Sequence, residues 1–167
     1  MTQNVVIRQA GLEDAATVAL LLTELNRTVG IVGADRAHEK LPENTDLTPL
    51  QAESRLRGVA GIETVLVAYA DGEPAGFTSL RIIPYLDQDT PYAEVTQMHV
   101  RPQYRRRGIA SQLVEAAEHQ AIGRGATCLH ILTGTDNHDA QAFYRSAGYE
   151  VECLDFQKFF ERRRVHA

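Results

Sequence analysis

The stretch MHVRPQYRRRGIA, from Met98 to Ala110, joins a predicted strand to a predicted helix through a basic turn that contains glycine. Such a turn leaves the first N–H groups of the helix without partners, and the helix dipole places its positive end there. Arg105, Arg106 and Arg107 add charge, and Gly108 has no Cβ, so a phosphate could approach the backbone closely. The turn therefore favours anion binding, and the alternative is a solvated charge run at a helix end. It has neither the Gly-Lys-Ser/Thr of a Walker A loop nor the three glycines of a dinucleotide fingerprint.

The rest of the chain is acidic around this basic turn. The sequence holds 17 basic and 22 acidic residues, which gives a net charge of −5. Four of the 17 basic residues lie between Arg101 and Arg107. This balance argues against a general nucleic-acid binder, because such proteins normally carry a basic excess.

Length and periodicity predict one domain spanning residues 1–167, with strands and helices mixed along the chain. An Asp-Gly turn at Asp71 and Gly72 predicts a hairpin, and Thr48-Pro49 predicts a helix start. Strands are predicted at residues 5–8, 64–70, 75–83, 92–100, 128–132 and 151–160, and helices at 12–29, from 48 to about 61, from 108 to about 123, and at 139–147. Antiparallel hairpins followed by strand–helix–strand units indicate a mixed α/β sandwich rather than a doubly wound parallel sheet.

Composition also predicts the compartment. No apolar run approaches the roughly 20 residues that cross a bilayer, and residues 1–10 do not resemble a signal peptide. Cys128 and Cys153 lie in strand-like apolar stretches, where we expect buried thiols in a reducing cytoplasm. The histidines are scattered and the two cysteines lack ligand spacing, so we expect no metal site.

Two motifs in order resemble those of the GNAT superfamily of N-acetyltransferases. Arg105-x-x-Gly108-x-Ala110 resembles the acyl-CoA pyrophosphate loop of that family, Gln/Arg-x-x-Gly-x-Gly/Ala. Residues 137–149 resemble its second motif, Asn-x-x-Ala-x-x-Phe/Leu-Tyr-x-x-x-Gly-Phe/Tyr. The order of elements matches as well, so the resemblance covers essentially the whole chain. It implies a GNAT fold, with a mixed sheet of six to seven strands splayed between strands 4 and 5, and helices on both faces.

The resemblance implies acetyl-CoA as the acyl-donor co-substrate. Its pyrophosphate would bind the backbone amides of Arg106, Arg107, Gly108, Ile109 and Ala110, with Ser111 able to add a hydroxyl. In this family the strand before the loop carries a bulge, and the pantetheine arm would pair with the backbone of Met98 and Val100. Asn137 would cap the next helix, contact the cofactor arm, or do both.

Catalysis in this reading is amine attack on a thioester. By resemblance Tyr144 would protonate the departing thiolate, although its helical spacing with Ala140, Phe143 and Ala147 also fits an ordinary core position. Glu94 resembles the base glutamate of one branch of the family, and a solvent-facing strand glutamate is the alternative. His99 and Gln97 are further candidates, as a base and as a group that orients water.

The acceptor would contact residues 29–46 and the turn at residues 84–91. The carboxylates Asp35, Glu39, Glu43 and Asp46 suggest a cationic amine such as a polyamine, an aminoglycoside or a lysine side chain. The resemblance thus implies an acyl-CoA-dependent N-acyltransferase that works by direct transfer in a ternary complex, and we expect neither nucleic acid nor a membrane as partner. Neither motif contains a cysteine, which disfavours an acyl-enzyme. The alternative is a non-catalytic CoA-binding module, and Phe156, Phe159 and Phe160 are a candidate homodimer interface.

Overall fold

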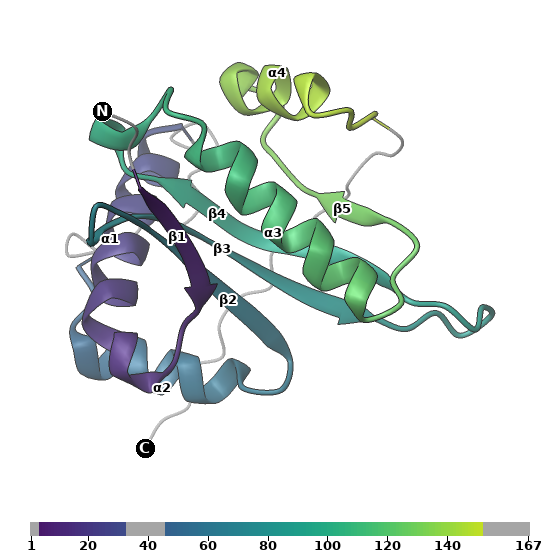
Figure 1. Cartoon of the computed structure of the whole chain (residues 1–167), viewed down its shortest axis with the longest axis horizontal. Helices are drawn as coiled ribbons and strands as arrows, with labels where there is room; N and C mark the ends of the chain where they lie inside the picture. The colour runs from purple at the N-terminus through teal and green to yellow at the C-terminus, as the bar shows by residue number, and fades with distance from the viewer. Residues whose placement is uncertain (1–3, 33–45, 152–167) are drawn as a thin grey trace, which may run out of the picture. The chain divides into compact units, whose positions relative to one another are not determined.

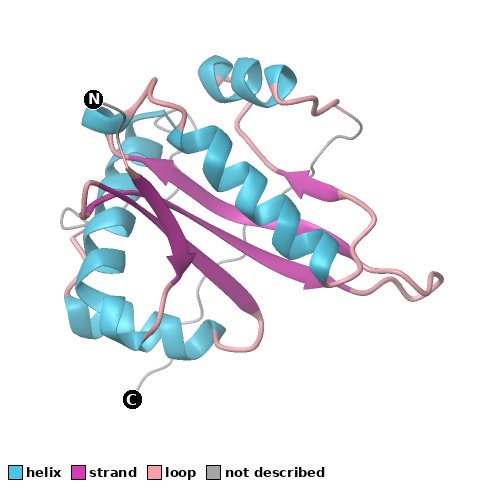
Figure 2. Cartoon of the chain, viewed as in Figure 1, coloured by secondary structure: helices cyan, strands magenta, loops and turns pink. Residues whose placement is uncertain are grey.

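The computed structural model describes residues 4–32 and 46–151, with the side chains of residues 29–32 left undescribed. The chain forms two compact units, Met1–Asn137 and His138–Ala167 (Figure 1). The larger unit contains a five-stranded sheet with helices against it (Figure 2). In the described part of the chain, no helix is both long enough and apolar enough to span a bilayer.

The strands of the sheet follow their order in the chain. They are β1 (Val5–Gln9), β2 (Glu63–Ala70), β3 (Glu73–Ile83), β4 (Tyr92–Val100) and β5 (Leu129–Ile131), in the order β1-β2-β3-β4-β5. The first three pairings are antiparallel, and β4 pairs with β5 in parallel. The mixed sheet is confirmed with five strands among the described residues rather than six to seven. The strand predicted at residues 151–160 lies, except for its first residue, outside them.

Helices pack on both faces of the sheet, as predicted (Figure 1). Helix α1 (Ala15–Val32) follows the short 3-10 turn η1 (Leu12–Asp14), and packs with α2 (Pro49–Val59) on one face. Leu21 and Leu22 of α1 meet Phe77 of β3 there. Helix α3 (Ile109–Gly123) covers the other face, where its Ala117 meets Leu80 and Val95. Each fully buried leucine or phenylalanine contributes about 1.5–3 kcal/mol relative to exposure.

Local signals in the sequence explain where several elements begin. Thr48 accepts a hydrogen bond from the Gln51 amide at 3.2 Å, and Pro49 is the first residue of α2. Asp71 and Gly72 both have positive φ, 52° and 87°, which is the type I′ geometry that joins β2 to β3. Both of these predictions are confirmed.

Strand β4 contains a bulge at Thr96. In the register with β3, Ser79 lies opposite Gln97 while Leu80 lies opposite Val95, so one residue of β4 has no counterpart. Thr96 and Gln97 consequently face the same side of the sheet, the side of α1 and α2. The parallel pairing with β5 ends at the same place, with Val95 opposite Ile131. The expected bulge before the basic turn is therefore present.

The two cysteines differ in whether the structure describes them. Cys128 is exposed and precedes β5 rather than lying in a buried strand, because β5 is only three residues long and is only partly buried. The prediction of a buried thiol there was wrong. Cys153 and the phenylalanines Phe156, Phe159 and Phe160 lie outside the described residues.

The smaller unit contains α4 (His138–Ser146), which Gly148 terminates with a φ of 89°. The Tyr149 amide donates to the Tyr144 carbonyl at 3.0 Å, as is typical of a helix that ends in a left-handed glycine. The predicted short helix and its glycine stop are therefore confirmed.

Candidate active site

The basic turn connects β4 to α3 with a compact, defined backbone. After β4, Pro102–Tyr104 forms the 3-10 turn η3, and the Arg101 amide donates to the Ala75 carbonyl of β3 at 2.9 Å. Arg106 and Gly108 have φ values of 61° and 78°, a conformation that costs most residues about 1–2 kcal/mol and glycine almost nothing. Gly108 is the N-cap of α3.

The N-terminus of α3 is open to an anion. Its first intrahelical bond runs from the Gln112 amide to the Gly108 carbonyl at 3.1 Å, so the preceding amides have no carbonyl acceptor in the helix. Arg105, Arg106, Arg107, Gly108 and Ser111 are exposed. A Cβ built on Gly108 would meet no atom within 4 Å, so the space above this residue is free among the described atoms. The turn therefore fits an anion, in agreement with the pyrophosphate that the family resemblance implies for it.

An ion-pair network anchors the turn to α1. Arg101 donates from Nε to Glu24 of α1 at 3.0 Å, and from Nη1 to the Pro74 carbonyl at 3.0 Å. His99 Nε2 lies 3.2 Å from the other oxygen of Glu24. Only 3% of the His99 side chain is exposed, and this burial lowers the pKa of its imidazole despite the neighbouring carboxylate. His99 therefore ties β4 to α1, which sequence reasoning did not foresee.

Strand β4 extends beyond the end of its pairing with β5. The parallel pairing with β5 stops at Val95, while β4 continues to Val100. Because the Arg101 amide points to β3, alternation places the backbone groups of Met98 and Val100 on the opposite edge, beyond the end of β5. The side chains of Met98 and Val100 pack in the core beside Leu113 of α3. The Val100 carbonyl accepts a hydrogen bond from Arg105 Nε at 3.1 Å, which a bound ligand strand would have to replace.

Glu94 lies on β4 four residues before Met98. Its carboxylate pairs with Arg81 of β3 at 3.1 Å, and 16% of its side chain is exposed. Directly across the sheet, Glu94 is opposite Arg81 on one side and His130 on the other. The Glu94 carboxylate is therefore partly buried and has a cationic partner.

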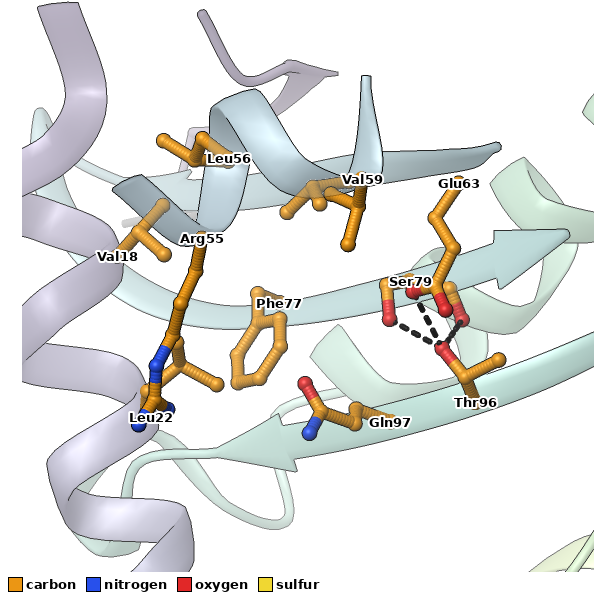
Figure 3. Close-up of a pocket in the computed structure, with 11 residues that line it drawn as sticks. Val18, Leu22, Arg55, Leu56, Val59, Glu63, Phe77, Ser79, Thr96 and Gln97 are labelled. Atoms are coloured by element: carbon orange, nitrogen blue, oxygen red, sulfur yellow. Dashed lines mark hydrogen bonds between the residues drawn. The ribbon is translucent and has the colours of Figure 1, made fainter. Parts of the chain in front are cut away.

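A pocket of about 260 Å³ lies on the α1 and α2 side of the sheet, next to the bulge (Figure 3). Phe77, Ser79, Thr96 and Gln97 come from β3 and β4. Thr96 Oγ1 donates to Glu63 of β2 at 2.9 Å, and lies 2.6 Å from Ser79 Oγ (Figure 3). Gln97 was predicted near the site, whereas Glu63 was missed because no local pattern places the start of β2 beside the middle of β4.

The other residues predicted for catalysis and binding lie at or after the end of the larger unit. Asn137 immediately precedes α4, and its amide donates to the Gly134 carbonyl at 3.1 Å. Tyr144 lies on α4, where its ring contacts those of Phe143 and Tyr149 at centroid distances of 5.2 and 5.9 Å. Burial raises the pKa of the Tyr144 phenol above its ordinary value, so the phenol keeps its proton at neutral pH.

Comparison with known proteins identifies the family. The model of the acetyltransferase (GNAT) family matches residues 26–149, which include the basic turn and α4. The chain belongs to the GNAT acetyltransferase family. Two relatives of this GNAT chain have named activities. Aminoglycoside N(6')-acetyltransferase type 1 of Klebsiella aerogenes is 38% identical over 103 residues, 58% of this chain and 68% of that protein. Aminoalkylphosphonate N-acetyltransferase of Salmonella typhimurium is 32% identical over 92 residues, 55% of this chain and 60% of that protein.

Solved structures confirm the GNAT fold. A protein from Agrobacterium tumefaciens superposes with a TM-score of 0.75 at 26% identity, over 93% of this chain and 99% of its own. An aminoglycoside N-acetyltransferase solved in complex with CoA superposes with a TM-score of 0.70 at 20% identity, over 99% of this chain and 98% of its own. Family and relatives together make this GNAT protein an N-acetyltransferase.

Proposed function

We propose that this GNAT protein transfers the acetyl group of acetyl-CoA to a primary amine by direct attack in a ternary complex. The observation that carries the proposal is the N-terminus of α3, where the first intrahelical bond runs from the Gln112 amide to the Gly108 carbonyl and leaves the preceding amides without a carbonyl acceptor in the helix. The exposed arginines Arg105, Arg106 and Arg107 supply charge for the CoA phosphates. Backbone amides at Gly108, Ile109 and Ala110 supply hydrogen bonds, as they do where anions bind helix N-termini. The backbone of Met98 and Val100 would receive the pantetheine arm.

The chemistry needs one proton acceptor and one proton donor. The amine nitrogen attacks the thioester carbonyl carbon, so that a C–N bond forms and the C–S bond breaks. The amine gives up one proton to a base, and the departing sulfur of CoA takes one proton from the Tyr144 phenol. Because burial raises the pKa of Tyr144, its phenol is present in the donor form at neutral pH.

For the base we propose Glu94, acting through a water that Gln97 orients. Glu94 lies on the same strand as the bulge, and Gln97 lines the pocket beside it. His99 is a poorer choice because it is buried and bonded to Glu24. The Glu94 carboxylate also forms an ion pair with Arg81 of β3.

The acceptor is an amine, but the family does not fix which one. The two relatives are named for aminoglycosides and for aminoalkylphosphonates, which share only the amino group as reacting centre. Of the acidic residues that suggested a cationic acceptor, Asp35, Glu39 and Glu43 lie outside the described residues. Asp46 is described, and it pairs with Arg27 of α1 at 2.6 Å.

The test is thiol release from acetyl-CoA across a panel of amines, with initial rates measured while both substrates are varied. Direct transfer predicts intersecting double-reciprocal lines and no release of CoA in the absence of an amine. The alternative, a non-catalytic CoA-binding module, predicts CoA binding by calorimetry with no thiol release on any amine. Parallel lines would instead indicate an acyl-enzyme.

A further inference from the structure

The pocket beside the bulge carries one charge of each sign among the described residues that line it. Glu63 from the start of β2 and Arg55 from α2 both line it. Figure 3 shows them on opposite sides of Phe77, with the Arg55 side chain extending toward Leu22. The two charges therefore lie apart, with an aromatic ring between them.

We propose that this pocket takes an acceptor whose primary amine is joined through an apolar segment to an acidic group. Glu63 faces the ammonium group, and Arg55 faces the acid. The inference rests on the proposed function, to which it adds the chemical class of the acceptor.

Glu63 can hold an ammonium group at the end of the pocket next to the bulge. Its Oε2 accepts a hydrogen bond from Thr96, and in the described part of the chain no hydrogen bond engages Oε1. The side chain is half-buried, and no cationic side chain forms an ion pair with it among the described residues. A carboxylate in such surroundings favours a positive partner. Thr96 is the bulge residue, so this end of the pocket adjoins the point where β4 and β5 separate.

Arg55 selects for an acid and against a second cation. It is exposed, and among the described residues no carboxylate forms an ion pair with it, whereas its neighbour Arg57 pairs with Glu53 at 2.7 Å. A polyamine or an aminoglycoside in this pocket would place additional positive charge beside the Arg55 guanidinium, which repels it. A carboxylate or a phosphonate would receive two parallel hydrogen bonds from the same group.

The walls between the two charges are apolar and the space is small. Val18, Leu22, Leu56 and Val59 line the pocket together with Phe77. The volume is about 260 Å³. A cavity of about 150 Å³ with apolar walls holds a benzene ring, so this pocket has room for one ring and a short chain. An apolar spacer between amine and acid fits these walls better than a polyhydroxylated ring.

The experiment compares 4-(2-aminoethyl)benzoate with phenethylamine, which lacks the acid, by calorimetry on the protein saturated with CoA. We expect wild type to bind the amino acid about tenfold more tightly, which corresponds to one charge-assisted contact. Arg55→Gln should abolish this difference by weakening only the amino acid, and Glu63→Gln should weaken both ligands about tenfold. Glu53→Gln, on the same helix but outside the pocket, should change neither affinity. Circular dichroism melts verify that each variant folds.

Binding is measured apart from turnover, so the two proposals fail separately. Selective binding of the amino acid without acetyl transfer would support the pocket assignment and overturn the proposed function. Acetylation of spermidine or kanamycin with a higher kcat/KM than the amino acid would overturn the pocket assignment alone. Equal weakening of both probes by Arg55→Gln, or no binding of either probe to wild type, would also overturn it.

Discussion

Glu94 and Arg81 form an ion pair with each other. Replacing either residue breaks this contact, but only the replacement of Glu94 removes the carboxylate. If Glu94 is the base, Glu94→Gln should lower kcat about 100-fold at pH 7.5, the lower end of what a general base contributes. Arg81→Gln is the matched control and should leave kcat within about threefold of wild type, because it keeps the carboxylate. Steady-state kinetics at saturating acetyl-CoA measure both. Equal losses in the two variants would show that the pair only holds the strands.

The proposed role of Tyr144 as proton donor can be tested by removing its hydroxyl group. Tyr144→Phe should lower kcat about 10- to 100-fold without changing the KM for acetyl-CoA, because the sulfur then leaves as a bare thiolate. Burial raises the pKa of this phenol above 10.0, so the donor form persists through the neutral and mildly alkaline range. Ionisation of Tyr144 should therefore not lower the wild-type kcat below about pH 10. In that range, wild type and Tyr144→Phe should show the same pH dependence of kcat. Tyr92→Phe on β4 is the control, and an equal loss there would point to a general effect of removing a phenol.

Backbone conformation and exposure were predictable where they depend on neighbouring residues, and contacts between distant segments were not. The positive φ of Gly108 and the exposure of Arg105–Arg107 follow from a glycine and charges at one helix start. The partners of Glu24, which are 75 and 77 residues away, leave no local pattern. The same applies to the hydrogen bond between Glu63 and Thr96, which joins β2 to β4 across β3.

At the scale of elements, helix α3 has a left-handed glycine at each end. Gly108 at its start and Gly125 after its end have φ values of 78° and 80°, and a Cβ on either would meet no atom within 4 Å. Alanine at either position should cost about 1 kcal/mol of unfolding free energy, because the backbone strain is the same. Only Gly108→Ala should also weaken CoA binding, by about tenfold, since its methyl group would enter the space proposed for the pyrophosphate.

Chemical denaturation and calorimetry with CoA measure the two effects separately. Gly125→Ala serves as the control for strain without a ligand contact. Equal CoA affinities in the two variants would contradict the pyrophosphate assignment at this helix end.

Element boundaries were predictable where capping residues, proline or glycine mark them in the sequence. Residues 92–100 were predicted as a strand and form β4, and Thr48-Pro49 and Asp71-Gly72 mark their turns correctly. Strand β5 was predicted too long and too buried, because an apolar run alone does not show over how many residues the neighbouring strand pairs with it. Here β4 bulges at Thr96, and the pairing stops after three residue pairs.

At the scale of the whole molecule, two buried groups couple stability to pH in separate ranges. Hydrogen bonds from Arg8, at 2.6 and 2.8 Å, together with those from the Gly11 amide and the Tyr69 hydroxyl, lower the pKa of Asp14 from 3.8 to about 2. The unfolded chain then binds more protons than the folded protein as the pH falls through this range, so stability is lost between about pH 4 and pH 2. Because Arg8 is half exposed, we expect this loss to be about 1–2 kcal/mol.

His99 also makes the protein less stable as the pH falls, but at higher pH than Asp14 does. Burial lowers its folded pKa below 6.5, so the unfolded chain binds the extra proton first, and stability falls as the pH drops below about 6.5. Urea denaturation at pH 7.5, 5.5 and 3.0 should show both losses. His99→Gln should remove the difference between pH 7.5 and 5.5, and Asp14→Asn should reduce the difference between pH 5.5 and 3.0. A variant that keeps its full pH dependence would show that other groups cause it.

The bulge at Thr96 has a consequence for how such a protein can diverge. In the proposed arrangement, β4 presents its backbone edge to the acetyl donor at Met98 and Val100, and its side chains to the acceptor at Thr96 and Gln97. A mutation changes side chains and leaves the peptide groups where they are, so the acceptor preference is free to drift while recognition of the donor is inherited unchanged. In this arrangement one strand recognises the donor through its backbone and the acceptor through its side chains. Relatives that are named for unrelated amines agree with such a division.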